Sequence, residues 1–568
     1  MTQAAVERYE AWLKDPVIDA TTKEELTAIK GNAKEIEDRF YRDLEFGTGG
    51  LRGVMGAGTN RMNIYTVGKA TQGLADWVLS QNKSNPSVVI AHDSRNNSPE
   101  FALDAALVLA ANGVTAYLFK GLRPTPQLSF AVRALGAVSG IVVTASHNPP
   151  EYNGYKAYGS DGCQLVPEDA EQVIGAIQRV SGFDQIRRIS QEEAEAKGLL
   201  RWLGEADDAA YVDTVVSHSL NRDLLKRGFG DTFNVVFTPL HGAGNMPVRQ
   251  VLKQAGFNNV HVVPEQEQPD GYFSTVKSPN PEEREAFTLA IKLAQEVEAD
   301  IIIGTDPDCD RMGAVVRNNE GEYVVLTGNQ SGAIMVNYLL STLKERGQFP
   351  ANGVVVKTIV TSEMGADIAR SYGAGVVNTL TGFKYIGEKM TQYEKTGEHT
   401  FLFGYEESYG YLTGTYARDK DAVIASLFIC EAAAYYKSQG KTLYDVLLEL
   451  YEKFGFYLEH LESRTLKGVD GVQQIAGIMN HWRSNPPAEV AGVRVTKMLD
   501  YLPGLDGLPA ENVLKFLLED GSWFCLRPSG TEPKIKVYFA VCGSSQADAA
   551  AAVERLTQAV MEVVDNKA

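Results

Sequence analysis

The stretch SVVIAHDSRNNSPEFALDAALVLAANGVTAYLF, residues 87–119, predicts the fold class of this chain. Residues 87–91 form a short apolar run that is typical of a buried strand, and the polar loop 92–96 follows it. Ser98, followed by proline, predicts an N-cap and the start of a helix, and the apolar run 114–119 predicts a second strand. A strand, a helix and a strand in this order make a βαβ unit, so we expect a parallel or mixed sheet covered by helices.

The same alternation recurs at 234–263 and at 353–379. Three such units at spacings of roughly 120 to 150 residues indicate three similar α/β domains rather than one large sheet. The end of the chain differs, because 513–526 has a hairpin pattern, 534–541 alternates like a strand and 545–564 is an amphipathic helix. This pattern predicts a C-terminal α+β domain with an antiparallel sheet.

The length of 568 residues agrees with about four domains. We expect a helical N-terminal extension and a first α/β domain within 1–205, a second α/β domain at 206–325, a third at 326–452 and the α+β domain at 453–568.

Composition and charge exclude several classes of protein. Hydrophobic residues make up 44% of the chain and charged residues 22%, as in ordinary globular proteins. The 54 basic and 72 acidic residues give a net charge of −18, which disfavours nucleic acid or an anionic membrane as partner but allows a local basic pocket for an anionic substrate. Five scattered cysteines without a CxxC pair indicate reduced thiols. The N-terminus has no apolar signal-peptide core and no stretch fits a membrane span, so we expect a cytoplasmic protein.

The sharpest motif is GIVVTASHNPPEYNGYK, residues 140–156. A buried strand ends in a small polar loop that would display Ser146 at the carboxyl edge of the sheet, where open α/β sheets bind ligands. A serine hydroxyl needs a base or a strong electrostatic partner to act as a nucleophile, and His147 and Lys156 are local candidates. The alternative is a turn whose polar side chains only satisfy backbone groups.

A second motif, DIIIGTDPDCDR, carries Asp306, Asp308 and Asp310 directly after an apolar strand. Three carboxylates at alternate positions would repel one another without a cation, and all-oxygen ligation suits Mg²⁺ or Mn²⁺. The alternative is a solvated acidic turn. The sequence favours the metal site.

Two further loops contain groups that suit a sugar phosphate. In FGYEESYG, residues 403–410, Glu406 and Ser408 could hold sugar hydroxyls, whereas adjacent Glu406 and Glu407 point to opposite faces and do not make a glycosidase pair. In RPSGTEPK, residues 527–534, a guanidinium, two hydroxyls and a glycine could enclose a phosphate; these are Arg527, Ser529, Thr531 and Gly530. Read alone, the first loop could equally be a solvated turn, and the second is more simply a Pro/Gly turn with an exposed arginine.

Two weaker loops offer additional cations. Residues 47–53 could bring Arg52 against an anion on a flexible, glycine-rich backbone. Residues 379–384 place Lys384 just past the strand of the third α/β unit, after Thr381 and Gly382.

Together these motifs resemble the α-D-phosphohexomutase superfamily over essentially the whole chain, and most closely its phosphoglucomutase branch, which includes phosphopentomutase-type enzymes. The matching elements are T-A-S-H-N-P, D-P-D-x-D-R, G-x-E-E-S-x-G and R-P-S-G-T-E-P, in the order of the family and one in each domain.

The resemblance implies four domains around a central cleft and a phosphoryl group carried on Ser146. It implies Mg²⁺ bound by Asp306, Asp308, Asp310 and the phosphoserine, and a glucose 1,6-bisphosphate intermediate between glucose 1-phosphate and glucose 6-phosphate. The roles it implies are general acid–base catalysis by Lys156 with His147 and charge neutralisation by Arg52, Lys384 and Arg311. Glu406 and Ser408 would hold sugar hydroxyls, and Thr381 and Gly382 would contact the substrate. The non-reacting phosphate would be bound by Arg527, Ser529, Gly530 and Thr531. The expected partner is a small sugar phosphate, and the expected state is a monomer or homodimer.

This chain departs from the family pattern at two places. Gly49 stands where many relatives have serine, and Glu407, Tyr409 and Gly410 replace the methionine, glycine and histidine of the bifunctional phosphomannomutases. The second difference favours glucose over mannose and leaves pentose phosphates open. A metal-dependent phosphatase with Asp306 as nucleophile and an inactive sugar-phosphate binding protein are the alternatives from other classes.

Overall fold

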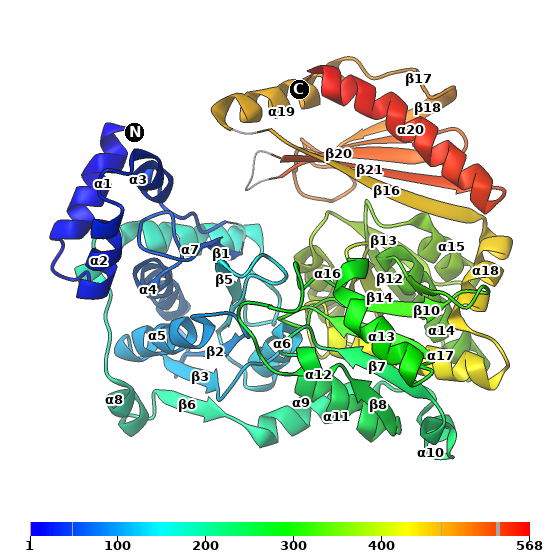
Figure 1. Ribbon diagram of the computed structural model, residues 1–568, viewed down its shortest axis with the longest axis horizontal. Helices are drawn as coiled ribbons and strands as arrows, with labels where there is room; N and C mark the ends of the chain where they lie inside the picture. Colours follow the sequence, from blue (N-terminus) through cyan, green and yellow to red (C-terminus); the bar gives the residue numbers. More distant parts are fainter. Residues whose placement is uncertain (1, 48, 467, 530–533, 568) are drawn as a thin grey trace. The chain divides into compact units, whose positions relative to one another are not determined.

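The computed structural model describes residues 2–47, 49–466, 468–529 and 534–567. The chain forms two compact units, Met1–Gly328 with Phe383–Gly440, and Asn329–Gly382 with Lys441–Ala568 (Figure 1). No helix in the described ranges is long and apolar enough to cross a membrane.

The N-terminal extension consists of short helices that pack against the first α/β domain (dark blue in Figure 1). Trp12 meets Phe40 and Tyr65 edge to face, which joins the extension to the helix that carries Tyr65. The helices of this segment are α1 (Gln3–Lys14), α2 (Ala20–Ala28) and α3 (Ala33–Phe40).

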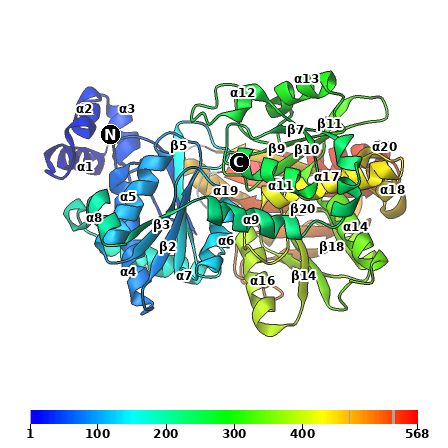
Figure 2. The same cartoon turned by 90° about the horizontal axis from the view of Figure 1, so that it is seen from below.

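The first sheet has the order β1-β5-β4-β2-β3-β6, in which β4, β2, β3 and β6 pair in parallel and β5 is antiparallel to both of its neighbours, β1 and β4. The βαβ unit predicted at 87–119 is confirmed, but Asn97 is the N-cap and Ser98 is already helical, because its hydroxyl donates to Asp93 instead of capping the helix. The strands are β1 (Gly50–Val54), β2 (Ser87–His92), β3 (Thr115–Phe119), β4 (Ser139–Val143), β5 (Tyr152–Tyr158) and β6 (Leu200–Leu203). Helices α4 to α7 lie around these strands (Figure 2). The helices of this segment are α4 (Ile64–Ser80), α5 (Ser98–Ala111), α6 (Thr125–Ala134), α7 (Pro167–Arg179), η1 (Phe183–Gln185) and α8 (Gln191–Ala196).

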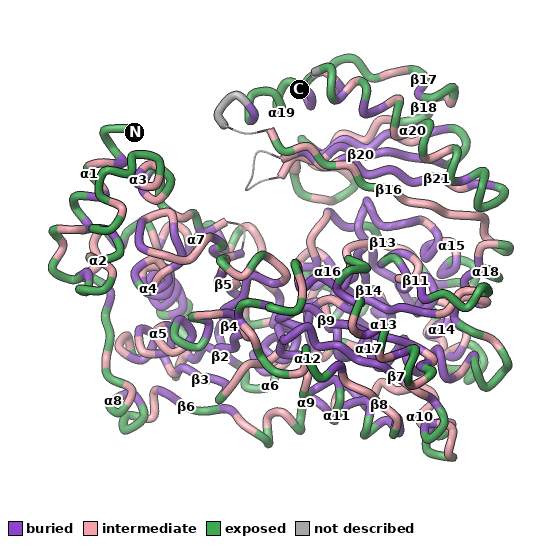
Figure 3. Tube along the Cα trace, in the orientation of Figure 1, coloured by how far each residue is buried: buried purple, intermediate pink, exposed green. Residues whose placement is uncertain are grey.

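The second sheet has the order β11-β10-β9-β7-β8, and its inner part repeats the first sheet. The parallel strands β9, β7 and β8 correspond to β4, β2 and β3, and the antiparallel strand β10 corresponds to β5. The strands are β7 (Asn234–Thr238), β8 (Asn259–Val262), β9 (Ile301–Thr305), β10 (Met312–Arg317) and β11 (Tyr323–Val325). The helices are α9 (Glu205–Ser217), α10 (Arg222–Lys226), η2 (Phe229–Asp231), α11 (Asn245–Ala255), α12 (Pro264–Glu267), η3 (Arg284–Phe287) and α13 (Thr288–Glu296). Strands β2, β4 and β9 are buried along their length (Figure 3), which explains their uninterrupted apolar sequences.

The third α/β segment contains the same two kinds of strand pair. Strands β12 (Gly353–Thr358) and β13 (Gly375–Thr379) are parallel, and β14 (Thr400–Glu406) and β15 (Gly410–Thr413) are antiparallel. The helices are α14 (Gly328–Glu345), α15 (Glu363–Ser371), α16 (Phe383–Thr396), α17 (Ala422–Ser438) and α18 (Leu443–Phe454).

The C-terminal domain is a fully antiparallel sheet of order β16-β21-β20-β19-β18-β17, as the hairpin pattern predicted. Helices α19 (Gly468–Ser484) and α20 (Gln546–Lys567) cover one face of the sheet (Figure 1) and contribute apolar side chains to its core. The strands are β16 (Phe456–Thr465), β17 (Glu489–Val490), β18 (Val493–Asp500), β19 (Leu514–Leu518), β20 (Trp523–Pro528) and β21 (Lys534–Gly543). Three mixed α/β segments followed by an antiparallel α+β domain are the fold class predicted from the sequence.

Candidate active site

Three of the predicted loops occupy the same position in the repeated topology. Each connects a strand to its antiparallel neighbour: β4 to β5, β9 to β10, and β14 to β15. Each contains one non-glycine residue in the left-handed region, Ser146 at φ 53°, Cys309 at φ 53° and Tyr409 at φ 66°. Side chains other than glycine, asparagine and aspartate rarely adopt this conformation, so all three loops are held by their surroundings.

Ser146 is 4% exposed, and its hydroxyl lies against the metal motif. The hydroxyl donates to Oδ2 of Asp306 at 2.8 Å, and Nδ1 of His147 lies 3.2 Å from Oγ of Ser146. Burial lowers the pKa of His147 well below its usual value, and the nearby cations Arg311 and Arg52 lower it further. The imidazole is therefore neutral near pH 7 and can share a hydrogen bond with the serine.

The three aspartates of the metal motif are buried together, and one oxygen of each lies within 4.8 Å of the others. Asp306 accepts through Oδ1 from the backbone N–H groups of Asp310 and Arg311. Burial raises the pKa of Asp306 well above its usual value, and Asp308 and Asp310 add to the effect. Oδ1 of Asp308 and Oδ1 of Asp310 are buried without a hydrogen-bond partner in the described part of the chain. Unpartnered buried carboxylate oxygens beside other carboxylates are a donor set that fits a hard divalent cation such as Mg²⁺.

Two lysines face this carboxylate cluster. Nζ of Lys156 lies 2.7 Å from Oδ2 of Asp308 and 3.2 Å from Oδ2 of Asp310, and Nζ of Lys420 lies 3.2 Å from Oδ2 of Asp310. Burial opposes ionisation of Asp310, but Lys156, Lys420 and Arg311 outweigh it and lower the pKa of this carboxyl far below its usual value. Burial also favours a neutral Lys156, but Asp308 and Asp310 outweigh it and raise the pKa of the ammonium. The shift is opposite to the lowering that a general base near neutrality needs.

The sequence reading missed Lys420. Its ammonium also contacts Asp419 at 3.1 Å, and Asp419 in turn accepts from the hydroxyl of Tyr158. A Cβ added at Gly410 would lie 2.2 Å from Cδ of Lys420, so this glycine makes room for the lysine side chain. One pattern in the sequence could have revealed this lysine: the charged run 418–421 stands directly before the apolar helix α17. Charged residues next to an apolar helix indicate ion pairs at the buried start of that helix.

Thr125, at the start of α6, is a second residue that the motifs did not reveal. Its hydroxyl donates to Oδ2 of Asp308 at 2.9 Å, and its backbone N–H donates to the carbonyl of the same aspartate. These bonds leave Oδ1 of Asp308 as the oxygen of this carboxylate without a hydrogen bond in the described part of the chain.

Arg311, Glu406 and Arg52 lie around the same loops. Arg311 pairs with Glu282 at 2.7 Å, and Glu406 is close enough to Arg311 and Lys420 to help raise the pKa of both cations. Arg52 is exposed on β1 and donates to Oδ1 of Asn148 in the serine loop at 3.1 Å. The structure thus brings residues of the first three predicted loops together within one compact unit.

Four other predicted residues, Thr381, Gly382, Lys384 and Ser408, lie in the third α/β segment. Lys384 is the second residue of α16, and its Nζ lies 5.1 Å from the ring centroid of Tyr385, whereas Ser408 is half-buried in the β14–β15 loop. Oγ1 of Thr381 is buried without a hydrogen-bond partner among the residues described, and Gly382 has a φ of 122°.

In the predicted phosphate loop, Arg527 pairs with Glu511 at 3.0 Å, and the backbone N–H of Ser529 donates to Lys534. Gly530 and Thr531 lie outside the described residues.

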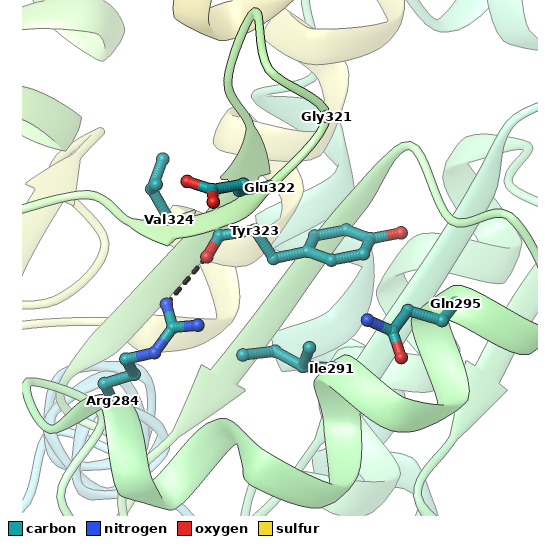
Figure 4. A pocket seen from close by; sticks show the side chains of 7 residues that line it. All are labelled: Arg284, Ile291, Gln295, Gly321, Glu322, Tyr323 and Val324. Carbon is teal, nitrogen blue, oxygen red and sulfur yellow. Dashed lines mark hydrogen bonds between the residues drawn. The ribbon is translucent and has the colours of Figure 1, made fainter.

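A surface hollow of about 450 Å³ lies elsewhere, beside β11 (Figure 4). Arg284 spans it by donating to the carbonyl of Tyr323 at 2.7 Å. None of the predicted site residues lines this hollow, so it is separate from the carboxylate cluster.

Four family models match the chain in order. They are described as phosphoglucomutase/phosphomannomutase alpha/beta/alpha domains I, II and III and the C-terminal domain, at residues 43–182, 209–321, 327–454 and 472–558. The chain belongs to the phosphoglucomutase/phosphomannomutase family. The predicted resemblance to the α-D-phosphohexomutase superfamily is confirmed, and this family member is a mutase, an isomerase of carbohydrate metabolism.

Relatives and solved structures agree with this membership. The phosphoglucomutase of Staphylococcus haemolyticus (strain JCSC1435) is 39% identical over 516 residues, covering 89% of this chain and 91% of that protein. The phosphoglucomutase of Staphylococcus aureus (strain MSSA476) is 39% identical over 521 residues, with 89% and 91% covered. The open form of Paramecium parafusin, a phosphoglucomutase, matches the fold with a TM-score of 0.71 at 18% identity, over 92% of this chain and 95% of that one. A phosphoglucomutase/phosphomannomutase family protein of Burkholderia thailandensis gives 0.67 at 19% identity, over 92% and 97%.

Proposed function

We propose that this mutase interconverts glucose 1-phosphate and glucose 6-phosphate through a phosphorylated Ser146 and glucose 1,6-bisphosphate. One contact carries the proposal: the Ser146 hydroxyl, held on a left-handed residue, lies 2.8 Å from a carboxylate of the three-aspartate cluster. A hydroxyl in this place can carry a phosphoryl group whose charge is neutralised locally. The names of the relatives favour glucose as the substrate.

Each group of the site has a task in this proposal. Asp306, Asp308 and Asp310 would hold Mg²⁺, which supplies charge neutralisation for the transferring phosphoryl group. The phosphoserine gives its phosphoryl group to the free hydroxyl of the sugar monophosphate, and the bisphosphate returns its other phosphoryl group to the serine. Lys156 and Lys420, both beside the carboxylates, are placed to neutralise charge, and Lys156, in its protonated form and with His147 in support, would give a proton to the reacting sugar oxygen.

The remaining predicted residues complete the proposal as substrate contacts. Glu406 and Ser408 would accept and donate hydrogen bonds to sugar hydroxyls, Thr381 and Gly382 would contact the substrate, and Lys384 would neutralise phosphate charge. Arg52 and Arg311 would contact the reacting phosphate, and the non-reacting phosphate would be held by Arg527, Ser529, Gly530 and Thr531. The domain boundaries near 205, 325 and 452, a cytoplasmic location and a monomer or homodimer belong to the same proposal.

The site geometry argues against a phosphatase with Asp306 as nucleophile. Both oxygens of Asp306 accept hydrogen bonds, Oδ1 from two backbone N–H groups and Oδ2 from Ser146. A phosphatase of this kind would also leave the buried Ser146 hydroxyl at the carboxylate cluster without a role.

The deciding experiment is a coupled assay on glucose 1-phosphate with Mg²⁺, with and without catalytic glucose 1,6-bisphosphate. Mannose 1-phosphate and ribose 1-phosphate run in parallel. Bisphosphate-dependent formation of glucose 6-phosphate, with mannose slow, supports the proposal. A preference for ribose 1-phosphate would keep the chemistry and change the substrate to a pentose phosphate. Release of free phosphate without isomerisation would replace the mutase assignment by a phosphatase.

A further inference from the structure

Arg95 lies behind the β4–β5 loop, residues 144–151, which carries Ser146. Among the described residues, it makes no hydrogen bond to the carboxylate cluster or to the side chain of a proposed substrate-binding residue. Its side chain is fully buried, and its guanidinium donates to three carbonyls of the loop that follows β4 and to the carbonyl of the first residue of β5. Nη2 donates to the carbonyls of Ser146 and Asn148 at 2.6 and 2.5 Å, and Nη1 to those of Pro149 and Tyr152 at 2.8 and 3.1 Å. One planar cation thus holds the backbone at four points between Ser146 and Tyr152.

Asp93 holds the other side of the same peptide segment. Its carboxylate lies 3.3 Å from Nε of Arg95 and accepts from the Thr144 hydroxyl at 2.6 Å. The hydroxyl of Thr144 in turn accepts from the backbone N–H of Ser146 at 2.8 Å. The Asp93–Arg95 pair therefore secures the peptide groups before and after Ser146, through Thr144 on one side and directly on the other.

This double support explains how Ser146 stays in the left-handed region. A non-glycine residue at φ 53° returns to a more favourable conformation unless both flanking peptide groups are fixed. Such a change of φ would swing the hydroxyl away from Asp306. The four carbonyl oxygens also point at Arg95, so their negative ends do not face the hydroxyl that would carry a phosphoryl group.

The contacts of Arg95 and its neighbour Asn96 extend to the second α/β domain. The ring of Phe273 lies 5.0 Å from the Arg95 guanidinium carbon, and a Cβ added at Gly271 would lie 2.3 Å from Oδ1 of Asn96. Phe273 is buried in a loop whose ends are fixed by His241, which contacts the carbonyl of Gln268 and the hydroxyl of Thr275. Arg95 thus joins the serine loop to the domain that carries the aspartates.

We propose that Arg95 is a positioning residue that holds Ser146 at the carboxylate cluster. The inference deepens the proposed function and rests on it where turnover is the measurement. Arg95 acts through the loop backbone and touches no reacting atom, so its loss is expected to slow phosphoryl transfer more than it weakens sugar-phosphate binding.

The test compares Arg95→Lys with Arg61→Lys. A lysine keeps the charge but cannot reach carbonyls in two directions with one ammonium. Arg61 is a matched control, since it is 6% exposed and donates to the backbone carbonyls of Asp38 and Asn60 away from the motif loops. Arg95→Lys is expected to lower kcat about a hundredfold with KM changed less than about threefold, and Arg61→Lys to leave both within about threefold.

Hydrogen exchange supplies a readout that needs no activity. Peptides covering residues 144–153 are expected to exchange at least about tenfold faster in Arg95→Lys than in wild type or Arg61→Lys. Unchanged exchange, or a loss of kcat equal to that in Arg61→Lys, would overturn the positioning role. A wild-type protein without mutase activity would refute the proposed function. The hydrogen-exchange rates would then decide by themselves whether Arg95 holds the β4–β5 loop. If Arg95→Lys does not fold, Thr144→Val takes its place. We then expect faster exchange at residues 145–148 and a kcat lowered about tenfold. No change in either quantity would contradict the positioning role of these contacts.

Discussion

The hydroxyl of Ser146 lies 2.8 Å from Oδ2 of Asp306, although 160 residues separate the two along the chain. The contact follows from the repeated topology, because the β4–β5 and β9–β10 loops are equivalent connections in two sheets of the same design. Each loop is short and contains one residue in the left-handed region: Ser146 itself in the first loop, and Cys309, between Asp308 and Asp310, in the second. Repetition of one α/β unit therefore placed a hydroxyl and a carboxylate cluster face to face.

Ser146→Ala removes the oxygen that the proposal phosphorylates. We expect turnover to fall by at least about 10⁴-fold, while binding of glucose 6-phosphate changes only a few-fold, because the other contacts remain. Steady-state assays and calorimetric titration measure the two quantities. Ser426→Ala is the control, since this buried hydroxyl of α17 has no hydrogen-bond partner among the described residues and lies outside the motif loops. Substantial mutase activity in Ser146→Ala would refute the covalent mechanism.

Asp308→Asn tests the metal assignment. Oδ2 of Asp308 already accepts from Thr125 and Lys156, so the unpartnered Oδ1 is the atom available to a cation. An amide in this place removes one negative charge and turns one oxygen into a donor, so we expect affinity for Mn²⁺ to fall about a hundredfold, with activity falling in parallel. Metal titration by calorimetry measures the affinity. Asp104→Asn, which affects a pair between α5 and Arg188 away from the cluster, should leave it unchanged. Equal metal affinity in Asp308→Asn and wild type would contradict the site.

Gly410→Ala tests the role of Lys420 without altering a charge. Gly410 does not have a positive φ, so alanine is acceptable to the backbone, but its Cβ would lie 2.2 Å from Cδ of Lys420. The lysine must move away from Asp310, and we expect kcat to fall at least about tenfold with a small effect on the free energy of unfolding. Gly477→Ala is the matched control, because no atom lies within 4 Å of its added Cβ. A kcat equal to that of Gly477→Ala would show that Lys420 is dispensable at its observed position.

The sequence predicted the elements and loops that local patterns encode. The apolar runs of β2, β7 and β12 and the helices after them lie where the alternation placed them, with the N-cap of α5 displaced by one residue. The three carboxylates and Ser146 were found because a strand followed by a dense polar loop is a local pattern.

Residues that act through distant partners could not be found in this way. Lys420 is 110 residues from Asp310, and the role of Thr125 depends on an aspartate 183 residues away. Arg95 was read only as part of a polar loop, since its four carbonyl partners lie 51 to 57 residues downstream. In the C-terminal domain, β16 and β18 escaped prediction because their exposed faces interrupt the apolar pattern. Contacts of this kind arise from tertiary packing, which periodicity does not record.

The last prediction concerns Lys515, a buried cation of β19. Its ammonium donates to the carbonyl of Ile359 at 2.6 Å and lies 4.0 Å from the ring centroid of Trp523. Burial lowers the pKa of Lys515 to about 8, and the charge of Lys357 contributes in the same direction. The pKa of a lysine in an unfolded chain is about 10.4. Between these two values the unfolded chain binds more protons than the folded chain, so the free energy of unfolding rises with pH, by at most about 1.4 kcal/mol per pH unit. Below pH 8 both states are protonated and this contribution is constant.

Lys515→Met removes the titrating group and should abolish this rise. We expect the difference in free energy of unfolding between wild type and Lys515→Met to move in favour of wild type as the pH increases from 8 to 10. Urea titrations at several pH values in this range, followed by tryptophan fluorescence, measure the difference. Lys497→Met is the control, because Lys497 is exposed on β18 and its replacement should give a curve parallel to wild type. A Lys515→Met curve that is also parallel to wild type would mean that the ammonium of Lys515 is not penalised by burial, because the unfolded chain would then hold its proton no more tightly than the folded one.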